Sequence, residues 1–395
     1  MRESNVPEDV GAIHNSILAL DAHLDIEATF FTPEQAEASG WQKLASLEKI
    51  EEGGLGAAFF VAYTDQGPLT GEGYARAYET VVEKIDTIRR LLDGPLQGKI
   101  GLALHPGEVH AVHNSGRIAA AIALENGYAL GEDLERLRHV YSLGVRYVTL
   151  TQVGHNQICD SKWAPGQPEP LHGGLSPFGR QVVAAMNELG CLIDVAHISK
   201  PSVLDVFRLS KAPVLVSHAG VQGVGGVGNI LDNEELDGLG ENGGVIHVVG
   251  LRRAIKADSE DKTQEIADLR AEFGLPVDFY PFFLALLERD ADTRRAYEQR
   301  LGEIESRHGK PSVRDLVDHV DYVVNRIGID HVGLSSDFIN HSFSLDGWRD
   351  ASETPNVTLE LVRRGYTADE IGKIWSGNTL RVWSEAEEVA AESKR

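Results

Sequence analysis

The sequence has little cysteine and no long apolar run. Cys159 and Cys191 are its only cysteines, and neither lies in a Cys-x-x-Cys pattern, so a disulfide framework is not predicted. No apolar run approaches the roughly 20 residues that a membrane helix needs. Residues 1–12 lack the charged start and apolar core of a signal peptide. We therefore expect a cytoplasmic protein with no membrane partner.

Basic residues are also scarce relative to acidic ones. The chain has 37 Lys and Arg against 60 Asp and Glu, a formal net charge of −23. A surface this acidic repels the phosphates of nucleic acids, so we expect no nucleic-acid partner. Hydrophobic residues make up 42% of the 395 positions, enough for a sizeable core. Because α/β barrels often fill such a length, we predict one domain over residues 1–395.

Short apolar runs, often rich in β-branched residues, predict eight buried strands. They are residues 17–20, 57–62, 118–124, 145–151, 191–196, 213–217, 244–249 and 331–334. Amphipathic or capped segments predict helices between and after them. These are residues 71–92, 176–189, 201–209, 313–327, 367–375 and 380–390. The alternation favours a (β/α)8 TIM-like barrel, with a doubly wound open sheet as the alternative. Residues 252–312 predict a helical insertion between strands seven and eight.

Side chains of the kind that bind metals or move protons stand at the ends of five of the eight predicted strands. They are His23 and Asp25, Glu125, His197, His218 and Asp337. The carboxyl ends of barrel strands meet at one face, so these side chains should converge there. They are more ligands than one tetrahedral ion needs, which favours a paired-metal site with a bridging carboxylate and another left to carry protons. Zinc suits this ligand mix, and Mn, Co or Fe can use it.

In this order, these residues resemble the membrane (renal) dipeptidase family, zinc peptidases of the amidohydrolase-like barrel group. The resemblance continues through LEKIEEGGLGAAFF, HGGLSPFGRQVVAAMNELGCLIDVAHIS, LVDHVDYVVNRIGIDHVGLSSDF and PNVTLELVRRGYTADEIGKIWSGNTLRV, and spans nearly the whole chain. It implies a homodimer with two zinc ions. His23 and Asp25 would bind one ion, and His197 and His218 the other. Glu125 would bridge the ions, and Asp337 would pass a proton from the bridging water to the leaving amine.

Two segments depart from the family pattern. Where the family has Leu-Thr-His after the fourth strand, this chain has Gln152 in place of the histidine that contacts the substrate carbonyl. His155 follows in a Gly-His-Asn pattern of bacterial members. Where the family has Pro-Arg-Asn, the chain has Val-Gly-Asn, with Gly228 in place of the arginine that clamps a carboxylate, followed by Asn229. Gln152 is a weaker, neutral donor, and a glycine cannot bind a carboxylate as arginine does.

These observations predict a binuclear zinc-dependent hydrolase. It would use a metal-bridging hydroxide to cleave an amide bond in a dipeptide or related small molecule, with Gln152, His155, Gly228 and Asn229 in the substrate site. The alternative is a metal-dependent tailoring enzyme acting on a non-dipeptide substrate, such as one without a free carboxylate. A substrate carboxylate could instead meet Arg252 or Arg253. A non-catalytic metal-binding scaffold is disfavoured because it has no use for Asp337 as a proton carrier.

Overall fold

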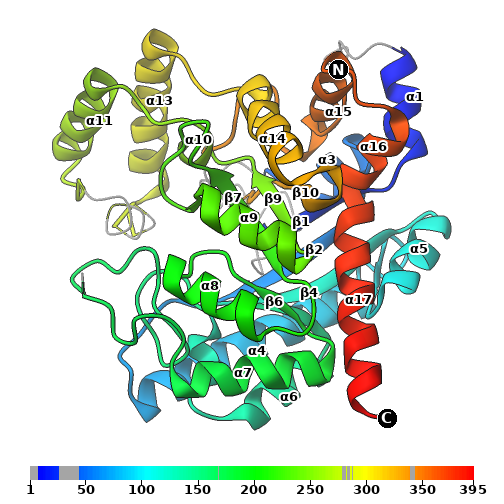
Figure 1. Cartoon of the computed structure of the whole chain (residues 1–395). Helices are drawn as coiled ribbons and strands as arrows, with labels where there is room; N and C mark the ends of the chain where they lie inside the picture. Colours follow the sequence, from blue (N-terminus) through cyan, green and yellow to red (C-terminus); the bar gives the residue numbers. More distant parts are fainter. Residues whose placement is uncertain are drawn as a thin grey trace.

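The computed structural model describes residues 8–25, 44–167, 169–277, 282, 285, 286, 288–338 and 343–395. Eight parallel strands pair in sequence order at its centre (Figure 1). They are β1 Ala19–Asp25, β2 Leu55–Tyr63, β4 Ile118–Glu125, β5 Val145–Thr149, β6 Leu192–Asp194, β7 Leu215–Val221, β9 Val245–Val249 and β10 Val332–Ser335. The backbone N–H of Asp337, just after β10, donates to the carbonyl of His23 in β1 at 3.1 Å. The sheet thus nearly closes, which confirms the TIM-like barrel over the open sheet.

Four helices outside the sheet have nearly the bounds that the sequence predicts. They are α4 Gly71–Asp93, α7 Pro177–Leu189, α8 Lys200–Leu209 and α14 Val313–Ile327. Helix α7 shows the local causes. The Ser176 hydroxyl accepts from the N–H of Gly179, Pro177 takes the first helical position, and Gly190 ends the helix at φ 75°. The capping serine, the proline and the glycine can each be recognised in the sequence, so the start and the end of such a helix are predictable.

Several shorter elements were not predicted from the sequence. They are α1 Glu8–Ser16, α3 Leu47–Glu52, β3 Ile100–Leu102, α5 Pro106–Asn114, η1 Gly127–Leu130, α6 Leu134–Ser142, β8 Ile230–Leu231, α9 Asn233–Asn242, η2 Ile329–His331, η3 Ala351–Glu353 and α15 Pro355–Arg363. Strand β3 pairs with β4, and β8 pairs with β7. The two predicted closing helices are one run, because α16 Ala368–Gly372 continues through a π-helical turn, η4 Lys373–Gly377, into α17 Asn378–Ser393.

The barrel has an inner and an outer apolar layer. The inner layer includes Leu20, Phe59 and Tyr147 from the strands, together with Trp383 from α17. The rings of Phe59 and Trp383 lie 5.5 Å apart between centroids, so α17 packs against the barrel interior. The outer layer fills the space between the strands and the surrounding helices. No helix in the described ranges is long and apolar enough to cross a membrane.

The segment between β9 and β10 contains the predicted helical insertion. It comprises α10 Arg252–Ile255, α11 Glu260–Glu272 and α13 Ala291–His308, and α11 and α13 lie side by side (Figure 1). Leu269 and Leu301 belong to an apolar cluster separate from the barrel core. Arg252 is buried here in an ion pair with Glu305. The extent of the domain, residues 1–395, stays a prediction.

Candidate metal centre

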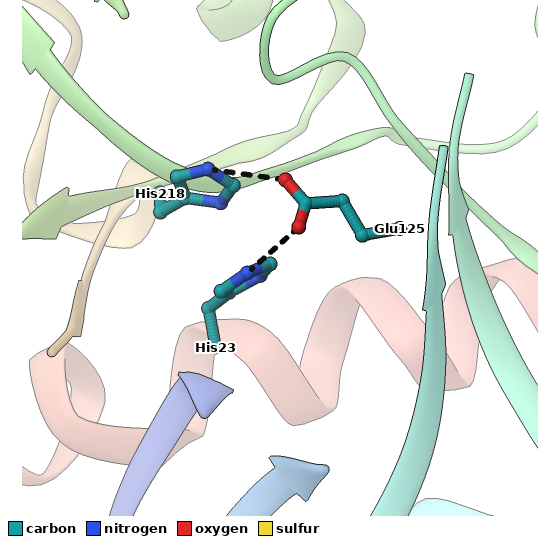
Figure 2. Close-up of side chains that lie close together, drawn as sticks. All are labelled: His23, Glu125 and His218. Atoms are coloured by element: carbon teal, nitrogen blue, oxygen red, sulfur yellow. Dashed lines mark ion pairs between the residues drawn. The ribbon is translucent and has the colours of Figure 1, made fainter. Parts of the chain in front are cut away.

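Ligand-type side chains from β1, β4 and β7 converge at the carboxyl end of the barrel. Ligand atoms of His23, Glu125 and His218 lie within 4.8 Å of one another, and those of His23, Asp25 and Asp337 form a second such group. Figure 2 shows His23 and His218 directed at the two oxygens of Glu125. Their Nε2 atoms lie 3.7 Å from Oε2 and 3.7 Å from Oε1, respectively. Glu125 therefore lies between the two imidazoles.

The fifth predicted ligand, His197, completes this cluster from the segment after β6. Its Nε2 lies 3.2 Å from Oε1 of Glu125 and 2.6 Å from Nε2 of His218. The structure thus brings together all six side chains predicted to bind metal or carry protons. Which of them bind an ion stays a prediction.

A bulge in β1 turns His23 and Asp25 inward. Ala22 packs in the inner layer and Leu24 in the outer one, although regular alternation would place both on the same face. The register of β1 against β2 shifts between Asp21 and Leu24, where β1 has one extra residue. An inserted residue reverses the alternation beyond it. His23 and Asp25 consequently face the site.

Strand β7 contains a second shift of the same kind. Leu215 packs in the inner layer and Ala219 in the outer one. Between Val216 and Ala219, β7 has one residue more than its partner β9. The extra residue directs His218 toward Glu125. Three of the predicted ligands, His23, Asp25 and His218, therefore depend on irregular strand pairing.

Backbone strain is also concentrated at this end of the barrel. Among the described non-glycine residues, only Asn126, His197 and Asp337 have positive φ, at 80°, 64° and 52°. Each lies one to three residues beyond a barrel strand. Left-handed backbone costs a non-glycine residue roughly 1–2 kcal/mol. Such strain often accumulates where side chains are held for function.

Hydrogen bonds fix two of the imidazoles with Nε2 directed at the site. The Tyr147 hydroxyl donates to the carbonyl of Ala22 at 3.2 Å, so it accepts from Nδ1 of His23 at 2.8 Å. The Ser217 hydroxyl donates to Asp194 at 2.5 Å and accepts from Nδ1 of His218 at 2.8 Å. Each ring then keeps a lone pair on Nε2, the form that binds a metal.

Two of the buried polar atoms that lack a hydrogen-bond partner among the described residues lie at this site, Nε2 of His23 and Oδ1 of Asp25. Leaving a buried polar atom unpaired costs about 1–3 kcal/mol. These two atoms belong to the same ligand group. A nitrogen lone pair and a carboxylate oxygen are donors that zinc and similar divalent ions accept. The side chains present therefore fit a metal ion.

The pKa shifts of the clustered side chains indicate where the site stabilises positive charge. Burial raises the pKa of Asp25 to about 8 and that of Asp337 to about 6. Burial works against a charged His23, but Glu125 and the two aspartates outweigh it and raise its pKa to about 10. Burial, with His23 and His197 nearby, holds the pKa of His218 well below its ordinary value. Glu125 and the two aspartates thus stabilise positive charge at His23, the kind of charge that divalent ions would supply.

The predicted substrate-binding residues lie in two different settings. The N–H of Val153 donates to Oε1 of Gln152 at 2.7 Å. His155 is buried and serves its own loop, because Nδ1 accepts from the N–H of Ser161 at 3.0 Å and Nε2 lies 3.0 Å from the carbonyl of Gln167. A substrate contact by either residue stays a prediction.

Gly228 and Asn229 lie in the loop between β7 and β8. Gly228 has a φ of 94°, and a Cβ built on it meets no atom within 4 Å. Asn229 hydrogen-bonds to the backbone of both His197 and His218. A role of these two residues in binding substrate likewise stays a prediction.

Sequence reasoning missed the buried carboxylates behind the ligands. Asp194 accepts hydrogen bonds from Thr149, Ser217 and the N–H of Ala196. Asp21 accepts from the backbone N–H groups of His23 and Ser336. A usable signal was present, since each aspartate interrupts an apolar strand, in LALDAH and CLIDVA. A buried carboxylate needs such partners.

Residues 8–395 match the family model described as membrane dipeptidase, peptidase family M19. The chain belongs to the membrane dipeptidase family. Dipeptidase tcpJ of Claviceps purpurea (strain 20.1) is 29% identical to it over 353 residues, 88% of this chain and 70% of that protein. Dipeptidase aclJ of Aspergillus oryzae (strain ATCC 42149 / RIB 40) is 30% identical over 347 residues, 87% of this chain and 70% of that protein.

The crystal structure of the probable dipeptidase PvdM from Pseudomonas aeruginosa matches with a TM-score of 0.80 at 29% identity. The match covers 97% of this chain and 98% of that one. These comparisons confirm the resemblance predicted from the sequence. As a member of the membrane dipeptidase family, the protein is a metal-dependent, dipeptidase-like hydrolase of amide bonds.

Proposed function

We propose that this membrane dipeptidase family member binds two zinc ions and cleaves the amide bond of a dipeptide or a related small molecule. The observation that carries the proposal is the pair of ligand groups that share His23. His23 and Asp25 would hold one ion, His197 and His218 the other, with Glu125 between them. When bound, such ions acidify a water molecule and polarise the scissile carbonyl.

Asp337 is the residue we assign to proton transfer. Its backbone N–H is held by the carbonyl of His23 at 3.1 Å, which keeps it beside the ligands. Burial raises the pKa of its carboxyl to about 6, and a pKa near neutrality suits a group that both accepts and donates a proton. Asp337 would take the proton from the attacking water and pass it to the leaving amine.

Metal analysis combined with Asp337→Asn tests both assignments. The purified protein should contain about two ions per chain, and one or none would contradict the paired site. Asp337→Asn should lower kcat about 10²–10⁴-fold with unchanged metal content, because the amide keeps the shape but cannot carry the proton. If the variant lost metal in proportion to its loss of activity, Asp337 would instead be identified as a ligand.

A second candidate function is a tailoring reaction on a substrate without a free carboxylate. It is favoured by Gly228, which offers no cation, and by Gln152, whose side-chain oxygen accepts from the N–H of Val153. Turnover of L-L and L-D dipeptides should be compared with turnover of their C-terminal amides by the metal-replete protein. Preference for the amides supports this candidate, and preference for the free acids supports a conventional dipeptidase.

The proposal includes the remaining expectations from the sequence: a small-molecule, dipeptide-like substrate, a homodimer and a cytoplasmic location. Light scattering after gel filtration tests the homodimer, which should have about twice the 43.0 kDa mass of the chain.

A further inference from the structure

Asn229 joins the backbones of two predicted metal ligands. The N–H of His197 donates to its Oδ1 at 3.1 Å, and its Nδ2 donates to the carbonyl of His218. His197 follows β6 and His218 lies within the neighbouring strand β7, with their Nε2 atoms 2.6 Å apart. One side chain thus spans the gap between the strands just behind the converging imidazoles.

His197 needs such support because its backbone is left-handed, with φ 64°. This conformation costs a histidine roughly 1–2 kcal/mol, so neighbouring contacts must hold it. The bond to Asn229 holds its N–H, and the N–H of Lys162 donates to its carbonyl at 2.7 Å. Loops from two different strands therefore fix the peptide groups on both sides of His197.

The loop that carries Asn229 is itself anchored. Strand β8 pairs with β7, with Gly220 opposite Ile230. The N–H of Gly220 donates to the carbonyl of Asn229 at 2.9 Å, and Nζ of Lys162 donates to the carbonyl of Ile230 at 2.5 Å. A group that positions metal ligands must be held firmly itself, and Asn229 meets this condition.

We propose that Asn229 is a positioning residue of the metal centre. Its amide fixes the spacing of His197 and His218 and thereby the affinity for the ion that they share. This inference rests on the proposed function for the presence of that ion. It assigns to Asn229 a role through the ligands rather than the direct substrate contact predicted from the sequence.

A titration of the metal-free protein with Co²⁺, followed by visible absorption, tests this role. Asn229→Ala should weaken Co²⁺ binding about 10–100-fold at one ion and change the absorption bands, which report ligand geometry. The matched control is Asn187→Ala. Asn187 also joins two groups, accepting from the N–H of Lys211 and donating to Ser210, but these precede β7. This variant should bind Co²⁺ like the unmodified protein.

Asn229→Asp covers the case in which the alanine variant does not fold. It keeps the side-chain shape and the acceptor for the N–H of His197, but it cannot donate to the carbonyl of His218. The Co²⁺ spectrum should therefore change even though the added negative charge favours cation binding. Unchanged affinity for Asn229→Ala together with unchanged spectra for both variants would overturn the inference. The titration needs no substrate, so absent dipeptide turnover would contradict only the proposed function.

Discussion

At the scale of the residue, Gly228 combines open space with a backbone that disfavours any side chain. Space does not exclude one, because a Cβ built there meets no atom within 4 Å. The backbone conformation disfavours one, because φ is 94° and residues other than glycine rarely adopt that value. Any side chain placed at position 228 therefore has to tolerate this loop conformation.

Gly228→Arg combined with Gln152→His should raise kcat/KM for dipeptides with a free carboxylate relative to their amides. The same variant should lose about 1–2 kcal/mol of unfolding free energy from backbone strain. Gly228→Ala is the control, since it adds the strain without the cation and should not change the preference. If the double variant leaves the preference as it was, our account of these two positions is wrong.

Ser217 links Asp194 to His218 and gives a second test with single residues. Ser217→Ala removes the acceptor of the Nδ1 hydrogen, so metal affinity should fall about 10–100-fold. Ser176→Ala also removes a buried hydroxyl, one that caps α7 and donates to the carbonyl of Gln157, and should cost about 1 kcal/mol of stability without changing metal affinity. Equal metal affinity of both variants, measured by competition with a chelating dye, would contradict the link.

At the scale of the element, α17 contributes to the core rather than only to the outer shell. Trp383 is fully buried, and its ring lies 5.5 Å from that of Phe59 in β2. Trp383→Ala should lower the free energy of unfolding by about 3–5 kcal/mol, because the side chain leaves a cavity that the rigid strands cannot fill. Urea denaturation measures the loss. Trp163→Ala should lower the free energy of unfolding much less, because Trp163 is 40% exposed.

Strand-end ligands were predictable because residue type and position alone mark them. His197 and Glu125 follow apolar runs, and parallel strands bring such ends together. The bulges in β1 and β7 could not be predicted, because a residue is extra only in comparison with the strand that it pairs with. The bonds of Asn229 were hidden for the same reason, because they depend on how a loop returns to two other strands.

At the scale of the whole molecule, buried neutral histidines link stability to pH. Burial lowers the pKa of His14 and His319, and lowers that of His247 to about 4. In the unfolded chain a histidine titrates near 6.5, so between these values the unfolded state binds more protons. Stability contributed by His247 is therefore full above pH 6.5 and is lost as the pH falls toward 4.

This contribution should reach about 3 kcal/mol, from 1.36 kcal/mol for each unit of pKa. His247→Gln removes the titrating ring, so its free energy of unfolding should fall less steeply between pH 6.5 and 4 than that of the unmodified protein. Chemical denaturation of both proteins measures this difference in the free energy of unfolding. Both are used in the metal-free form, so that release of metal at low pH does not contribute. Parallel pH profiles would show that His247 does not carry this dependence.

The position of Trp383 also bears on how the chain is made. Phe59 is synthesised before most of the barrel, whereas the helix that packs against it follows every barrel strand in the chain. A nascent chain can have all eight strands outside the exit tunnel and still lack this part of the barrel interior. Because such distant contacts form late, completion of the core should await the synthesis of α17.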